Sequence, residues 1–94
     1  MNAKDLTLNI AVNLGRVSRW AMEGKKARVE QFLKETEDYL AQLESTPRNR
    51  RFEKTFLSFK IHFANLKDNS SRTDAWAEEA LTWANILTHR AKLA

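Results

Sequence analysis

The chain offers few side chains that could carry out catalysis. It has two histidines, His62 and His89, and no cysteine in 94 residues. Phe59 and Ile86 stand three positions before them, so the Glu-x-x-His pairs of di-iron bundles are missing. Without cysteine the chain has no thiolate nucleophile, no disulfide and no cysteine zinc site. We therefore expect a protein that is not an enzyme and that uses no metal or cofactor.

Two other patterns that can mark an active site are also weak. The acidic pairs Glu37–Asp38 and Glu78–Glu79 are adjacent in sequence, and adjacent residues on a helix do not face each other. We expect these carboxylates to be solvated separately rather than to share a proton. Gly15 and Gly24 stand alone, whereas a phosphate-binding loop needs several glycines close together.

Turn-forming residues divide the chain into helical segments. They gather at Gly24, at residues 45–47 and at residues 68–71, and they leave segments of about twenty residues between them. Short connections favour antiparallel neighbours. We predict a single all-α domain over residues 1–94, an up-down four-helix bundle.

Apolar residues recur at helical spacing in each segment, which predicts one buried stripe per helix. Thr46 before Pro47 fits an N-cap followed by proline at the first helical position. Ser71 and Asp74 fit a capping box at the start of the last helix. The predicted stripes are Leu6, Ile10, Leu14, Val17 and Ala21; Val29, Phe32, Leu33, Thr36, Leu40 and Leu43; Phe52, Phe56, Phe59, Phe63 and Leu66; and Trp76, Ala80, Trp83 and Leu87.

The sequence leaves two alternatives to this bundle. The first two segments could form one long N-terminal rod, which would give three helices, although the stripe changes direction across Gly24 and favours a turn there. Apolar residues also alternate in residues 6–14 and 57–63, which is compatible with strands and a less favoured α+β fold. Asn9 and Asn13 are poor strand residues, and two strands alone would form a marginal sheet.

No stretch suggests a membrane or secretory segment. No run approaches the ~18 consecutive apolar residues that a membrane span needs. The first apolar stretch is broken by Asn9 and Asn13 and lacks the pattern of a signal peptide. We expect a cytoplasmic protein without membrane contact.

The net charge of +4 is unevenly distributed along the chain. Residues 29–46 are acidic and lie between basic residues 1–28 and 47–72, which favours charge pairing within the fold. Basic residues cluster at the start of the third helix, where positive charge opposes the helix dipole. We treat this cluster as a candidate anion-binding site and RNA or DNA binding as a less favoured function. Its members are Arg48, Arg50, Arg51 and Lys54.

Several apolar residues lie off the predicted stripes. Leu8 and Val12 form a second apolar stripe on the first helix, Leu57 and Ile61 form one on the third, and Trp20 lies beside basic residues. A helix that is apolar on two faces is central in its domain or contacts another chain, and a short chain has little material to cover it. We predict a non-enzymatic protein–protein interaction module that forms a homodimer, with these five residues at or near the interface. An adaptor or antitoxin-like regulator of another protein is an alternative.

Overall fold

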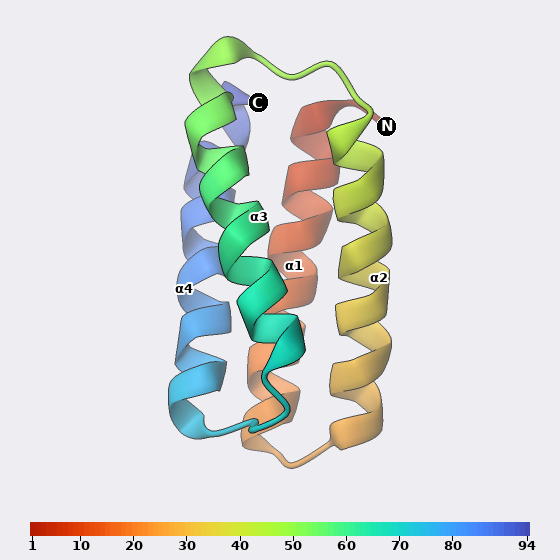
Figure 1. Cartoon of the computed structure of the whole chain (residues 1–94), viewed down its shortest axis with the longest axis vertical. Helices are drawn as coiled ribbons and strands as arrows, with labels where there is room; N and C mark the ends of the chain where they lie inside the picture. The colour runs from red at the N-terminus through yellow and green to blue at the C-terminus, as the bar shows by residue number, and fades with distance from the viewer.

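The computed structural model describes the whole chain, Met1–Ala94, as a four-helix bundle without strands (Figure 1). Its helices are α1 (Ala3–Met22), α2 (Lys26–Glu44), α3 (Glu53–Asp68) and α4 (Asp74–Arg90). Short 3₁₀ turns, η1 (Arg50–Phe52) and η2 (Ala91–Leu93), precede α3 and follow α4. The helices run alternately up and down along a body of 37 × 19 × 19 Å. The predicted bundle is confirmed, and the α+β alternative is wrong.

Gly24 ends α1 and thereby excludes the long N-terminal rod. Its φ angle is 70°, a left-handed conformation that glycine adopts at little cost. The Lys25 N–H donates to the Trp20 carbonyl at 2.9 Å, and the Gly24 N–H donates to the Ala21 carbonyl at 3.2 Å. These two hydrogen bonds form a Schellman motif, which terminates a helix and satisfies its last carbonyls.

The two predicted N-caps are wrong by a few residues. Asn49 caps η1, because its Oδ1 accepts a hydrogen bond from the Arg51 N–H at 2.9 Å, whereas the Thr46 hydroxyl donates back to the Gln42 carbonyl at 2.6 Å. Pro47 therefore lies in the loop rather than in the first turn of a helix.

At the start of α4 the cap is Thr73 rather than Ser71. The Thr73 hydroxyl accepts from the Trp76 N–H at 3.2 Å, while the Ser71 N–H donates to the Asn69 side chain at 3.0 Å. Ser71 therefore belongs to a turn that precedes the helix. In the α2–α3 and α3–α4 connections, Asn49 and Thr73 thus accept the hydrogen bonds from the free backbone N–H groups that we predicted for Thr46 and Ser71.

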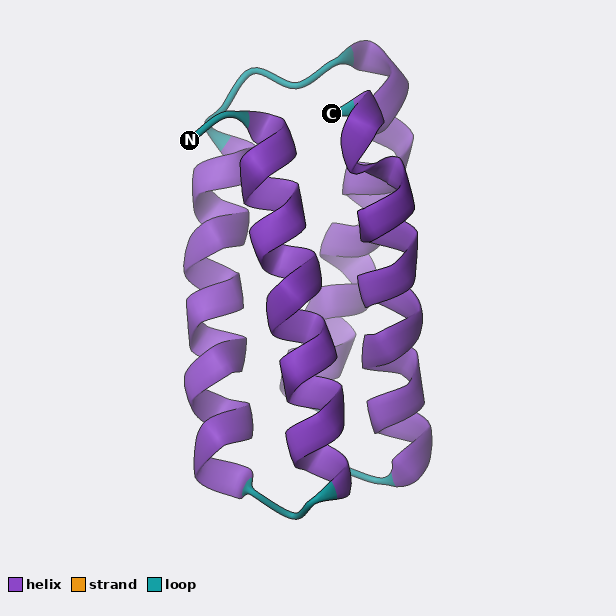
Figure 2. Cartoon of the chain, turned by 180° about the vertical axis from the view of Figure 1, so that it is seen from behind, coloured by secondary structure: helices purple, strands orange, loops and turns teal.

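The helices are not equally close together. α1 packs closely against both α2 and α4, while α3 lies diagonally across from α1 and covers the remaining side (Figures 1 and 2). α1 and α4 bury many small residues, which allow helix axes to approach. α3 buries phenylalanines, whose rings hold its backbone farther from its neighbours. The small buried residues are Ala3, Thr7, Ala11 and Ser18 on α1 and Ala77, Ala80 and Ala84 on α4.

The core lies where the predicted stripes meet. Every residue of the four stripes is buried or half-buried, so this prediction is confirmed. An aromatic layer joins α3 to α4: the Phe59 ring lies 5.5 Å from the Phe63 ring and 5.4 Å from the Trp83 ring, centroid to centroid. These tilted ring pairs are a favourable aromatic packing geometry.

Ion pairs join the acidic α2 to basic residues of α3 and of the loop that follows it. Glu44 pairs with Lys60, Glu37 pairs with Lys67 at 2.5 Å, and Glu30 pairs with Arg72 at 2.9 Å. The hydrogen bond from Lys67 lowers the pKa of Glu37 below its ordinary value of 4.5. These partly exposed pairs add little stability, but they favour the observed arrangement of helices, as the charge pattern predicts.

None of the helices is long and apolar enough to span a membrane.

Candidate interaction surfaces

The outward face of α3 carries two large apolar side chains that nothing in the chain covers. Leu57 is 54% exposed and Ile61 is 64% exposed, and their spacing of four residues places them one turn apart on one side of the helix. We call this side the α3 outward face. It comprises Lys54, Leu57, Ser58, Ile61, Ala64, Asn65 and Asp68.

The second apolar stripe, on α1, lies on the other side of the bundle. Val12 is 52% exposed, and Leu8 is half-buried. Because α1 and α3 are diagonal neighbours, their outward faces point in opposite directions. The predicted set of Leu8, Val12, Leu57 and Ile61 therefore does not form one surface. It forms two separate surfaces, one on each side of the molecule.

Trp20 is engaged within the fold. It is half-buried, and its ring lies 4.8 Å from the Phe32 ring. The guanidinium groups of Arg19 and Arg28 lie 5.6 and 5.2 Å from the centre of the Trp20 ring, within the range of cation–π attraction. The structure thus places Trp20 at the junction of α1 and α2 and not on either exposed apolar face.

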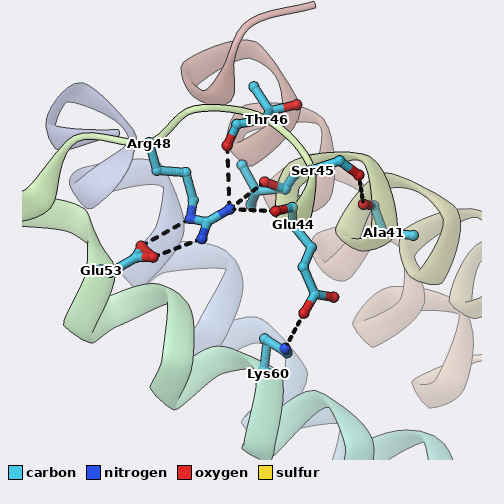
Figure 3. A network of polar contacts seen from close by, with 8 residues as sticks. Ala41, Glu44, Ser45, Thr46, Arg48, Glu53 and Lys60 are labelled. Carbon is cyan, nitrogen blue, oxygen red and sulfur yellow. Dashed lines mark hydrogen bonds and ion pairs between the residues drawn. The ribbon is translucent and has the colours of Figure 1, made fainter.

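Arg48 of the predicted anion-binding cluster is a structural residue (Figure 3). Its Nη2 and Nε donate to the two carboxylate oxygens of Glu53 at 2.7 and 2.9 Å. Its Nη1 donates to the carbonyls of Leu43 and Glu44 at 2.7 and 2.9 Å. The guanidinium also lies 3.9 Å from the centre of the Phe56 ring. The side chain is only 15% exposed, so Arg48 is not available to an external anion.

Arg72 plays a similar part at the other end of α3. It lies in the loop before α4, donates to Glu30 at 2.9 Å and stacks 4.4 Å from the centre of the Trp76 ring. The Trp76 indole N–H in turn donates to the Leu66 carbonyl at 3.0 Å. Sequence reasoning did not single out Arg72, because its ion-pair partner Glu30 lies far away along the chain.

The other basic residues of the predicted cluster are exposed. Arg50 and Arg51 lie in η1, at the end of the bundle that also holds both chain termini. Lys54 lies on the α3 outward face, and none of the three forms an ion pair within the chain. The structure therefore reduces the predicted cluster to Arg50, Arg51 and Lys54.

A groove of about 630 Å³ runs between α3 and α4. Trp83 and Ile86 contribute its apolar lining, and no carboxylate lines it. Such a lining suits polar or anionic groups better than cations. Sequence reasoning missed the groove, because its walls come from two helices that only the fold brings together. Its polar lining consists of Lys54, Thr55, Ser58, Thr82, Asn85, His89 and Arg90.

The two histidines are not brought together. The His62 Nδ1–H donates to the Ser58 carbonyl at 2.8 Å, and the His62 ring lies 5.1 Å from the Trp83 ring. His89 lies in the last turn of α4, where a basic side chain is favoured by the helix dipole. No group of three or more acidic or histidine side chains has the arrangement of a metal site.

Comparison of this chain with known protein families, with curated proteins and with solved structures finds no match.

Proposed function

We propose that the protein is a non-enzymatic interaction module that forms a homodimer through the α3 outward face. The observation that carries this proposal is the exposure of Leu57 and Ile61, 54% and 64%, one turn apart on the same side of α3. Single exposed apolar residues are common on protein surfaces. Two large ones side by side on one helix face are characteristic of a contact with another chain.

The surroundings of this pair favour α3 over α1 as the dimer interface. Between Lys54 and Asp68, which stand at its two ends, the α3 outward face carries only the small or uncharged residues Ser58, Ala64 and Asn65 beside Leu57 and Ile61. On α1, the exposed face of Val12 continues within one or two turns into Arg16 and Arg19. Charge is depleted at the centre of protein interfaces, so the α3 face fits this role better.

The apolar gain sets an expectation for the strength of the dimer. Burying the exposed half of each Leu57 and Ile61 contributes ~1 kcal/mol per side chain. A symmetric dimer buries both side chains of both copies, which gives a total gain of ~4 kcal/mol. This gain is near the low end of the free energy that association costs. The apolar gain therefore only offsets the smallest cost of association. The contacts around the apolar centre must supply the net affinity, and we expect a weak, concentration-dependent dimer.

Replacing Leu57 and Ile61 together by aspartate is expected to abolish the dimer and to leave the helical content unchanged. Both side chains are exposed in the chain, so aspartate costs the fold little, whereas it would place buried charge at the interface. Sedimentation equilibrium from about 10 µM to about 1 mM covers binding free energies of about −7 to −4 kcal/mol. Circular dichroism reports the fold.

Val12→Asp is the matched control, because Val12 is similarly exposed on the opposite side of the bundle. We expect this variant to dimerise like the wild type. If Val12→Asp dissociates the dimer and the α3 variant does not, the interface lies on α1. A wild-type chain that stays monomeric over the whole concentration range would contradict the proposed function.

Nucleic-acid binding is the second candidate function. It is favoured by one observation: Arg50 and Arg51 are exposed, form no ion pair within the chain, and lie at the same end of the bundle as Lys4, Arg90 and Lys92. Cations that are free of intramolecular partners can neutralise phosphates at no cost to the fold. The net charge of +4 is small for a nucleic-acid-binding protein, so we favour dimerisation over this function.

For this candidate, the affinity for duplex DNA should fall steeply with salt, and Arg50→Ala with Arg51→Ala should reduce the logarithmic salt slope by about 2. Fluorescence anisotropy with a labelled duplex over a series of salt concentrations measures the slope. Lys25→Ala with Lys26→Ala removes the same charge at the opposite end and should leave the slope unchanged. An equal effect of both variants, or no binding at low salt, would reject this function.

A further inference from the structure

We infer that α3 pairs antiparallel with α3 of a second copy of the chain, about a two-fold axis at Ile61, so that Lys54 of each copy meets Asp68 of the other. This inference rests on the proposed homodimer and specifies its geometry. It comes from the distribution of charge on the α3 outward face, which complements itself only when the helix is reversed.

The spacing of three residues sets the register. Ile61 is seven residues after Lys54 and seven residues before Asp68. Seven residues are close to two helical turns, so the three side chains lie on the same face of α3. An antiparallel pair centred on one residue brings together residues at equal distances before and after it. An axis at Ile61 therefore places Lys54 beside the other copy's Asp68, and the symmetry repeats the pair.

The centre of such a pair would be apolar and closely packed. Ile61 meets its own copy at the axis, and Leu57 lies against Ile61 and Ala64 of the second chain. Ala64 is exposed and small enough to leave room for the leucine. The charged residues between Lys54 and Asp68 do not interrupt this face, because Lys60 and Lys67 pair with Glu44 and Glu37 of α2.

The two flanking charges have no partner within the chain. Lys54 and Asp68 are both exposed, and neither takes part in an intramolecular ion pair. Both also oppose the dipole of α3, since Lys54 lies in its first turn and Asp68 is its last residue. Reversed pairing gives each charge an opposite partner.

The same charges disfavour the parallel arrangement. A parallel α3 pair would place Lys54 beside Lys54 and Asp68 beside Asp68, and like charges in contact across an interface oppose association. The charge pattern therefore selects both the second copy as partner and the direction in which its helix runs.

Single cysteines test the register directly, because the chain contains no cysteine of its own. Ile61→Cys places two thiols at the axis, where helix packing brings backbones close enough for a disulfide. Asn65→Cys, one turn further along the same face, separates the thiols by about 12 Å along the helix axis. Under mild oxidation we expect Ile61→Cys to form a covalent dimer on a non-reducing gel and Asn65→Cys to remain monomeric.

Charge exchange tests the flanking pairs independently of any cross-link. Lys54→Asp and Asp68→Lys should each weaken the dimer about tenfold, because each turns two attractive pairs into repulsive ones. The double variant restores opposite charges in both pairs and should return the Kd to within about twofold of the wild type. Sedimentation equilibrium measures all four proteins, with circular dichroism as the check on folding.

The possible outcomes separate this inference from the proposed function. A monomeric wild-type chain overturns the homodimer and the register together. A wild-type dimer in which Asn65→Cys cross-links and Ile61→Cys does not leaves the homodimer standing and overturns the register. A double charge variant as weak as the single ones overturns the Lys54–Asp68 pairs.

Discussion

Replacing Phe59 by alanine is expected to lower the free energy of unfolding by about 3–5 kcal/mol. Phe59 is 1% exposed, and its ring lies in the aromatic layer between Phe63 and Trp83. Because α3 approaches the rest of the bundle mainly through such rings, alanine would leave a cavity that the helix backbone cannot close without moving. The loss is a large part of the stability of a small domain, which is typically 5–15 kcal/mol.

Urea denaturation followed by circular dichroism measures this effect through the midpoint of unfolding. Leu57→Ala is the matched control, because it removes a large apolar side chain from the same helix at an exposed position. We expect its effect on stability to stay within about 0.5 kcal/mol when the protein is dilute and monomeric. Equal losses in the two variants would show that the aromatic layer is not the main attachment of α3.

Replacing Arg48 by methionine is expected to lower the free energy of unfolding by about 2 kcal/mol. Methionine is a flexible side chain of similar length, but it removes the guanidinium, and with it the contact with the Phe56 ring and the hydrogen bonds to Glu53 and to the carbonyls of Leu43 and Glu44. Those carbonyls belong to the last turn of α2, where helix carbonyls have no partner within the helix. The variant therefore loosens the end of α2 and the start of α3 together.

The effect of Arg48→Met should depend on pH in a defined direction. The hydrogen bonds from Arg48 lower the pKa of Glu53 below its ordinary 4.5. A carboxyl group whose pKa is lower in the folded chain stabilises the fold fully above its unfolded pKa, and that contribution is lost as the pH falls through the folded value. The stability difference between wild type and variant should therefore narrow as the pH falls below 4.5.

Chemical denaturation at a series of pH values checks this prediction. Arg51→Met is the control, since Arg51 is exposed and makes no ion pair, and it should unfold like the wild type at every pH. If Arg48→Met and Arg51→Met had the same stability at neutral pH, the network in Figure 3 would not hold the α2–α3 connection together.

Apolar periodicity was enough to predict the helices and their buried faces. The stripes from Leu6 to Leu87 are buried or half-buried as expected, because a residue's place on a helix follows from spacing alone. Helix starts were predicted less well. Thr46 and Asn49 both precede α3, and Ser71 and Thr73 both precede α4, so several side chains compete to cap each N-terminus. The backbone path of the loop decides among them.

The candidate surfaces could be predicted only in part. The spacing of Leu57 and Ile61 identified an exposed apolar face, but it could not place that face relative to Val12, because helix order around a bundle is a tertiary property. The basic cluster could not reveal that Arg48 is enclosed, since its partners include carbonyls that the sequence does not mark. The α3–α4 groove was missed for the same reason, as its walls meet only in the folded chain.

The close packing of α1 against α4 has a consequence for how the protein is made. While the chain is being synthesised, α1 and α2 can form a hairpin at Gly24 as soon as both have left the ribosome. The part of the apolar face of α1 that α4 covers must stay open until α4 follows, and α4 begins at Asp74 whereas α1 ends at Met22, so this contact joins distant segments of the chain. The nascent hairpin therefore exposes the part of the apolar face of α1 that α4 covers later. At this stage the chain is most open to chaperone binding and to unwanted association.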